Sequence, residues 1–122
     1  MLNILAVGAG GFLGAVCRYL VGLIPLSESF LFPIKTFAIN VVGCVLIGVI
    51  AVSVIKQGGW NPQLLLFLKV GVCGGFTTFS TFALETADLI AGGHFAVACT
   101  YVVLSTLAGV ASVLWIESVS LQ

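Results

Sequence analysis

Four long apolar segments restrict what this chain of 122 residues can fold into. They cover residues 1–24, 36–55, 64–90 and 95–116. A helix needs about 20 residues to cross roughly 30 Å of hydrocarbon, and each segment is long enough. Strands of a membrane barrel would be about 10 residues long and would alternate apolar with polar residues, which these segments do not. The sequence therefore predicts an all-α membrane protein with four transmembrane helices.

The composition excludes a soluble fold. Hydrophobic residues make up 61% of the chain and charged residues 7%, and the formal net charge is zero. A soluble surface needs roughly 25–35% charged residues, and the sequence has no basic cluster that would neutralise the phosphates of a nucleic acid. We therefore expect the lipid bilayer, and no nucleic acid, as the partner of this chain.

Turn-forming residues mark the three connections between the segments: Pro25, Ser27, Glu28 and Pro33, then Gly58-Gly59 and Asn61-Pro62, then Gly92-Gly93. These connections are too short to be interdomain linkers. We therefore expect residues 1–122 to form a single four-helix transmembrane domain. The first segment lacks a basic leader and an Ala-x-Ala site, so we do not expect a cleavable signal peptide.

Residue types that support catalysis or metal chemistry do not cluster in the sequence. His94 is the one histidine, and Cys17, Cys44, Cys73 and Cys99 fall one to a segment with no C-x-x-C pair. Metal and redox sites need clustered ligands. We therefore expect no enzyme, and we expect the cysteines to serve as small packing residues.

The basic residues do not favour one orientation in the membrane. With four spans, Arg18 and Lys35 fall toward one side, and Lys56 and Lys69 fall toward the side of the termini. Basic residues near helix ends normally gather on the cytoplasmic side. Two interpretations of this even count stay open. The insertion machinery settles a weak bias, or the chain inserts both ways and pairs as an antiparallel dimer.

Glycines spaced four residues apart predict close helix packing. Gly10 and Gly14 form such a pair in the first segment, and Gly71 and Gly75 form another in the third. Small residues let helix backbones approach closely in lipid. The glycine-rich run at residues 8–14 misses the GxGxxG spacing of nucleotide binding, so we interpret it as a packing surface.

A primary amide lies near the middle of the second segment. Asn40 shares a helix face with Thr36 and Gly43, and the fourth segment carries a polar stripe that includes Tyr101 and Ser105. An amide in lipid is costly unless its polar atoms are satisfied. Asn40 therefore either holds two helices together or lines a polar path, and both interpretations stay open.

The third segment predicts a broken helix. As one helix, residues 64–90 would run about 40 Å, which exceeds the hydrocarbon core. Gly74, Gly75, Thr77 and Thr78 weaken helix propensity in its middle. A break at membrane depth is tolerated where it is buried or lines a cavity. Freed carbonyls can then hold a cation, and amide ends favour anions.

Phe79 and Phe82 follow the expected break as i, i+3 neighbours. Phenylalanines in a membrane helix commonly face lipid or the core, and that interpretation stays open. The electropositive edge of a phenyl ring can also contact a small anion.

Arg18 and Glu85 are the charged residues nearest to membrane depth. Each can reach the interface from close to a helix end. They can also pair with each other or with polar groups at a vestibule, where Arg18 would attract anions. No cation lies in the central part of any span, so we expect a path through this protein to rest on neutral donors.

The chain resembles the Fluc (CrcB) family of microbial fluoride channels over almost its whole length. Residues 10–19, GGFLGAVCRY, look like the family's GGxxGAxxRY. Residues 36–43, TFAINVVG, are similar to its TxxxNxxG, and residues 74–82, GGFTTFSTF, resemble its GGxTTFSTF. The three motifs occur in order on three of the four segments.

The resemblance implies a fluoride-selective channel that lets fluoride leave the cell passively. It implies two pores in an antiparallel, dual-topology homodimer in a prokaryotic inner membrane. It assigns the following residues to the fluoride pathway: Asn40 as a donor, Phe79 and Phe82 as ring edges, Ser80, Thr81 and Thr36 along a polar track, and Tyr101 as its support. It places Arg18 near the vestibule. It also puts the main-chain carbonyls of Gly74 and Thr77 on a structural sodium ion (Na+) at the dimer centre.

Two positions depart from the family pattern. Lys35 stands where the family commonly has Gly, and Cys44 stands where it often has Ser. Lys35 can change the charge at a pore mouth. Neither departure alters Asn40 or the third motif.

Two other functions stay open. A small multidrug-type antiporter also has about four helices and dual topology, but it needs a carboxylate deep in the membrane, for which only Glu85 is available. A non-conducting assembly subunit needs only close-packing surfaces and uncharged helices.

Overall fold

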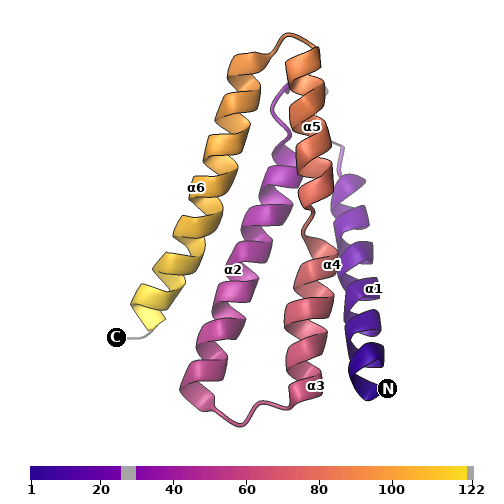
Figure 1. The fold of residues 1–122 in the computed structure, drawn as a ribbon, viewed down its shortest axis with the longest axis vertical. Helices are drawn as coiled ribbons and strands as arrows, with labels where there is room; N and C mark the ends of the chain where they lie inside the picture. The colour runs from indigo at the N-terminus through magenta and orange to yellow at the C-terminus, as the bar shows by residue number, and fades with distance from the viewer. Residues whose placement is uncertain (26–29, 121–122) are drawn as a thin grey trace.

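The computed structural model describes residues 1–25 and 30–120, and this part of the chain is helical with no strand. The helices, drawn in Figure 1, are α1 (Leu2–Gly22), α2 (Ile34–Gln57), α3 (Pro62–Leu65), η1 (Leu66–Cys73), α4 (Gly74–Phe76), α5 (Phe79–Ala91) and α6 (Phe95–Ser120). The prediction of an all-α protein is confirmed. Ser27 and Glu28 of the first connection lie outside the described residues.

Four helical stretches are long and apolar enough to cross a membrane, as predicted. They contain 21, 24, 30 and 26 residues, and the third runs from Pro62 to Ala91 through α3, η1, α4 and α5. The start of α1, the end of α6 and the turn between α2 and α3 lie at one end of the molecule (Figure 1). The connection between α1 and α2 and the turn between α5 and α6 lie at the other end, so each span crosses the molecule once.

The turns form where the sequence predicts them. Gly58 and Gly59 have φ values of 59° and 64°, which L side chains rarely adopt. Asn61 then caps α3, because its side-chain oxygen accepts the N–H groups of Gln63 at 2.8 Å and Leu64 at 3.2 Å. A tight turn between α2 and α3 results.

Glycines bring α1 against the first half of the third span. A Cβ at Gly10 would overlap the Phe67 carbonyl oxygen, and a Cβ at Gly14 would overlap that of Val72. In return, a Cβ at Gly71 would lie 2.7 Å from the Gly10 Cα. The two backbones touch only because no side chains intervene, which confirms the predicted packing surface.

The second half of the third span packs elsewhere. Leu89 of α5 joins Ala98 and Tyr101 of α6 in a buried cluster, and Phe37 and Phe82 pack against it. Along the rest of the bundle α2 packs on α6, where Gly48 faces Ile116 and Gly109 faces the Cys44 sulfur. The third span therefore changes its packing partner from α1 to α6 at its middle (Figure 1).

The predicted break lies at Thr77 and Thr78, between α4 and α5. Thr77 has ψ of 159° and Thr78 has φ of −150° and ψ of 115°, so both residues are extended. Gly74 and Gly75, which precede them, still belong to α4. The β-branched residues, and not the glycines, leave the helix.

A π-helix, η1, precedes the break and was not predicted. In a π-helix each N–H bonds to the carbonyl five residues earlier, which widens the turn. The first part of η1 is a run of ordinary apolar residues that carries no local signal for the wider turn.

Candidate functional site

Asn40 of α2 bridges the helix break. Its Nδ2 donates to the Thr78 carbonyl oxygen at 3.1 Å, and its Oδ1 accepts the Thr78 N–H at 2.9 Å. The side-chain amide therefore replaces the backbone partners that Thr78 loses when the helix stops. A primary amide has two N–H donors, so one of them remains for another acceptor.

The last carbonyls before the break lose their helical donors, and those of Gly74 and Thr77 are among them. The Gly74 carbonyl would receive the Thr78 N–H in a continuous helix, but that N–H bonds to Asn40. The Thr77 carbonyl would receive the Thr81 N–H, but that N–H bonds to the Thr78 hydroxyl at 3.2 Å. Gly74 is exposed, and the space around its Cα is open. These are the two carbonyls that the resemblance assigns to a sodium ion.

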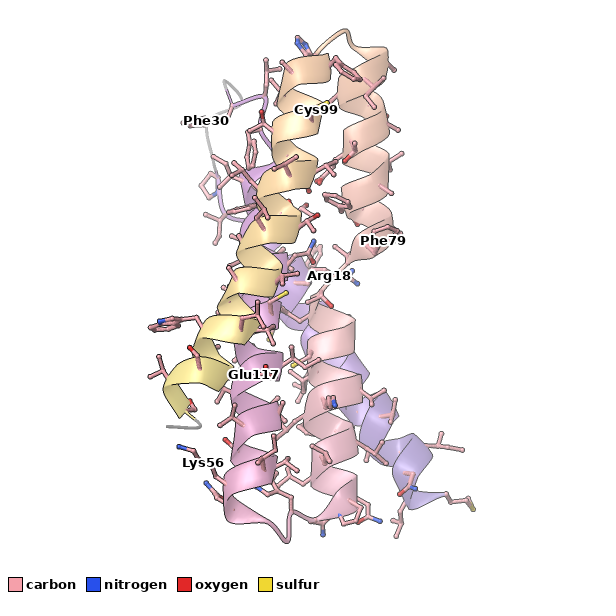
Figure 2. All side chains as sticks on the ribbon, turned by 60° about the vertical axis from the view of Figure 1, so that its left-hand side comes forward. Arg18, Phe30, Lys56, Phe79, Cys99 and Glu117 are labelled. Atoms are coloured by element: carbon pink, nitrogen blue, oxygen red, sulfur yellow. The ribbon has the colours of Figure 1, made fainter. Side chains whose placement is uncertain are left out.

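Arg18 lies beside the break and not at the end of the molecule (Figure 2). Its Nη1 is 3.5 Å from the Thr77 carbonyl oxygen. A guanidinium at this position brings positive charge to the carbonyl end of α4, which the helix dipole favours. A role at a vestibule stays a prediction.

Hydroxyl groups cap the start of α5. Thr78 is 7% exposed, accepts the Thr81 N–H, and donates to the Thr81 hydroxyl at 3.0 Å. Its hydroxyl also lies 3.4 Å from that of Ser80. The structure thus places Ser80 and Thr81, both predicted for a polar track, in the exposed first turn of α5.

A carboxylate joins three spans. Glu85 of α5 accepts a hydrogen bond from the Thr36 hydroxyl of α2 and another from the Tyr101 hydroxyl of α6, each at 2.7 Å. Thr36 is 5% exposed and Tyr101 is fully buried. Hydrogen bonds to an ionised group are roughly twice as strong as neutral ones. The sequence left two partners open for Glu85, namely Arg18 or polar groups. In the described part of the chain Glu85 bonds to the polar groups, and Arg18 contacts the Thr77 carbonyl instead.

The two phenylalanines of the third motif belong to a row of aromatic rings. The Phe79 and Phe82 centroids are 5.7 Å apart, and the Phe82 and Tyr101 centroids are 4.9 Å apart. Phe32 continues the row from Tyr101 at 5.3 Å, with the two ring planes at 78°. Phe79, at the outer end, is 80% exposed and labelled in Figure 2.

An open cavity of about 410 Å³ lies against the break. The residues that line it come from α2, η1, α4, α5, α6 and the break itself: Asn40, Gly43, Cys44, Ile47, Lys69, Cys73, Gly74, Thr77, Thr78, Phe79, Phe82, Ser105 and Thr106. The Ser105 hydroxyl is buried and has no hydrogen-bond partner within the described residues.

Five of the predicted site residues line this cavity: Asn40, Phe79, Phe82, Gly74 and Thr77. Five others lie around it without lining it: Thr36, Ser80, Thr81, Tyr101 and Arg18. Sequence reasoning missed the following lining residues: Cys44, Ile47, Lys69, Cys73 and Thr106. For Lys69 the sequence did contain a signal, because Lys69, Cys73 and Thr77 are spaced four residues apart and so share one helix face.

Cation ligands at this site would have to come from the backbone. Across residues 1–25 and 30–120, no group of three or more His, Cys, Asp or Glu side chains is placed to hold a metal ion. Carbonyl oxygens released at helix breaks are the usual alternative in membrane proteins.

Known proteins match the chain over nearly all of this architecture. The model of the family described as CrcB-like protein, Camphor Resistance (CrcB), matches residues 5–116, from α1 into α6. A curated relative from Chlorobaculum tepidum, named fluoride-specific ion channel FluC, is 46% identical over 112 residues, which are 91% of this chain and 88% of the relative. A relative of the same name from Ruminiclostridium cellulolyticum is 44% identical over 106 residues, 86% of this chain and 82% of its own. A third, from Azobacteroides pseudotrichonymphae, is 37% identical over 113 residues, 92% and 90% of the two chains.

Proposed function

This chain belongs to the CrcB family, and we propose that it is a fluoride-selective channel through which fluoride leaves the cell down its electrochemical gradient. The observation that carries the proposal is the cavity at the helix break, where Asn40, Phe79 and Phe82 face one space. The printed name of the relatives, fluoride-specific ion channel, supports fluoride as the ion.

Neutral groups at the cavity suit a strongly hydrated anion. Fluoride holds water tightly, so a path must replace that water with donors and partial positive charge. Asn40 keeps one N–H, the Ser105 hydroxyl has no partner in the described chain, and the ring edges of Phe79 and Phe82 are electropositive. None of these groups carries a full charge that would trap the ion. Chloride is larger and fits such a constriction poorly.

The hydroxyl groups around the cavity have supporting roles in this proposal. Thr36 and Tyr101 hold Glu85, and this contact fixes α5 against α2 and α6. Ser80 and Thr81 extend the polar track along the first turn of α5, next to the Thr78 cap.

The working unit in this proposal is an antiparallel homodimer with two pores in the inner membrane of a prokaryotic cell. In the described chain one lysine remains near each end of α2, Lys35 in its first turn and Lys56 in its last, and this even distribution supports insertion in both orientations. The open cavity and the 80% exposure of Phe79 support a second copy that completes each pathway.

A structural Na+ at the dimer centre is the second part of this assembly proposal. The Gly74 carbonyl supports such an ion, because it has lost its helical N–H donor and Gly74 is exposed. The Thr77 carbonyl has also lost its helical donor, but the Arg18 Nη1 lies 3.5 Å from its oxygen, so it would have to exchange this contact for the ion. Two copies would contribute four carbonyl oxygens. Bound there, the ion would hold the two breaks together by charge.

Anion release from liposomes tests the function. Vesicles that contain the purified protein are loaded with potassium fluoride or potassium chloride, valinomycin relieves the charge, and ion-selective electrodes record the external anion. We expect rapid fluoride release and negligible chloride release. Release of a quaternary amine driven by a proton gradient and lost in Glu85→Gln, with no fluoride release, would instead support an antiporter.

The two phenylalanines give the assay a matched pair of variants. Phe79→Ala and Phe82→Ala are expected to slow fluoride release, because each removes a ring edge from the cavity. Phe12→Ala is the control, since Phe12 is also exposed, at 69%, but lies on α1 away from the cavity lining. Equal release by all three variants would reject the role of the rings.

A further inference from the structure

Lys69 lies inside the third span. It lies about two helical turns after Pro62, the first residue of that span, and about two turns before the break at Thr77. An ammonium group this far from a helix end is costly in lipid. Such residues almost always face the bundle interior or a water-filled space.

Lys69 faces the cavity. It lies one turn below Cys73 and two turns below Thr77, and all three line the space that Asn40 and Phe79 reach from the other side. Lys69 is the one charged residue among the described residues that line this cavity. The expectation that the path rests on neutral donors is therefore wrong along the cavity, and at the break the Arg18 guanidinium lies beside the Thr77 carbonyl.

Glu85, the acidic residue nearest to Lys69 along the third span, does not line the cavity. Glu85 lies on α5, beyond the break, where the Thr36 and Tyr101 hydroxyls occupy both of its carboxylate oxygens. Among the described residues that line the cavity, the formal side-chain charge is therefore positive and lies at the end where Lys69 is found.

We propose that Lys69 sets the rate of fluoride passage. Its charge attracts fluoride into the cavity from the end of the bundle where α1 begins. This inference rests on the proposed channel function. A charge lining a low-dielectric cleft raises the local concentration of the opposite ion. Because Lys69 lies about two helical turns before the break, it attracts the anion without holding it at the break itself.

Ionic strength separates this role from a packing role. The Debye length is roughly 30 Å at 0.01 M salt and about 3 Å at 1 M, so a steering charge acts at low salt and is screened at high salt. Fluoride release is measured at fixed fluoride concentration, and the ionic strength is set with a potassium salt of a large organic anion. Lys69→Met removes the charge and keeps an unbranched side chain that is one atom shorter.

A second lysine provides the matched control. Lys56 lies in the last turn of α2 and does not line the cavity, and Figure 2 shows it far from Phe79. At low ionic strength we expect Lys69→Met to slow fluoride release roughly tenfold. We expect Lys56→Met and Lys69→Arg to match the parent. At about 1 M salt the difference between Lys69→Met and the parent should fall below about twofold.

Two results would overturn the proposal. One is parent-like release by Lys69→Met at low ionic strength, which would mean that Lys69 extends to the interface as an anchor. The other is a defect that stays constant as salt rises, which would mean that the side chain only packs. If Lys69→Met does not fold, Lys69→Gln takes its place under the same criteria. Absence of fluoride release from the folded parent would reject the channel function itself, whichever lysine is changed.

Discussion

The two halves of the third span are held in different ways. The first half, η1 and α4, lies against α1 through direct backbone contact at Gly10, Gly14 and Gly71. The second half, α5, is held by side chains, in particular the hydrogen bonds from Thr36 and Tyr101 to Glu85 and the row of aromatic rings. The break at Thr77 and Thr78 lets one span use both kinds of contact.

The two halves therefore differ in how much substitution they tolerate. Backbone contact leaves no room for a side chain, so the first half tolerates little change but offers few polar groups. The second half carries hydroxyls, a carboxylate and phenyl rings, and it begins at the cavity. We therefore expect substitutions in the first half to affect folding most, and substitutions at the break and in α5 to have smaller effects on stability.

The largest effect is expected at the glycine contact. Gly14→Ala places a methyl group into the backbone of Val72 and Phe76, which cannot rotate away. Overpacking typically costs 1–3 kcal/mol and occasionally more, so we expect a loss of about 3 kcal/mol in the free energy of unfolding in detergent micelles. Gly8→Ala is the control, because nothing lies within 4 Å of a Cβ there. Equal stability of the two variants would reject direct backbone contact.

A smaller effect is expected at the carboxylate. Tyr101→Phe removes one of the two donors to Glu85 and should cost about 2 kcal/mol of unfolding free energy, as for hydrogen bonds to charged groups. Tyr19→Phe should have no effect, because Tyr19 is 65% exposed. If Tyr101→Phe unfolds like the parent, the second half is not held by this bond.

A substitution at Gly43 tests how α2 packs against the break that separates the two halves of the third span. A Cβ at Gly43 would overlap the Thr77 methyl group. We expect Gly43→Ala to cost about 1–2 kcal/mol in the same unfolding measurement. Adding Thr77→Ser removes that methyl group and should recover most of the lost free energy of unfolding. A double variant as unstable as Gly43→Ala alone would show that another contact is responsible.

The smallest effect is expected at the cap of α5. Thr78→Val removes the oxygen that accepts the Thr81 N–H, and loss of an N-cap typically costs about 1 kcal/mol. Hydrogen exchange should become faster in the first turn of α5 and stay unchanged in α1. Thr78→Ser keeps the oxygen and should protect that turn as the parent does. Faster exchange throughout the bundle would argue against a local cap.

Patterns along the chain predicted the parts of this fold that depend on local sequence. Uncharged length predicted the spans, the spacing of Gly10 and Gly14 predicted the contact with the third span, and the run of Gly and Thr predicted the break. Each of these signals lies within one segment. The cavity residues Asn40, Phe79 and Phe82 were recognised because their motifs are also local.

Contacts between spans could not be predicted from patterns within a single segment. Sequence order does not show that Asn40 would bond to Thr78, or that Glu85 would meet Thr36 and Tyr101, since these pairs depend on how the helices rotate. Lys69 was placed near a membrane end by counting basic residues, and only the packed bundle puts it against the cavity. The wider turn of η1 has no marker residue.

The central claim is that the Asn40 amide both braces the break and leaves a neutral donor for fluoride. Asn40→Asp keeps an oxygen for the Thr78 N–H but removes the donor and adds negative charge. Asn61→Asp is the matched control, because Asp caps a helix as well as Asn does and Asn61 lies outside the cavity lining. The measurement is fluoride release from liposomes that contain each folded variant. We expect Asn61→Asp to release fluoride like the parent, and Asn40→Asp to release it at least roughly tenfold more slowly because like charges repel. Equal release by the two variants would show that the Asn40 amide is not a donor for fluoride.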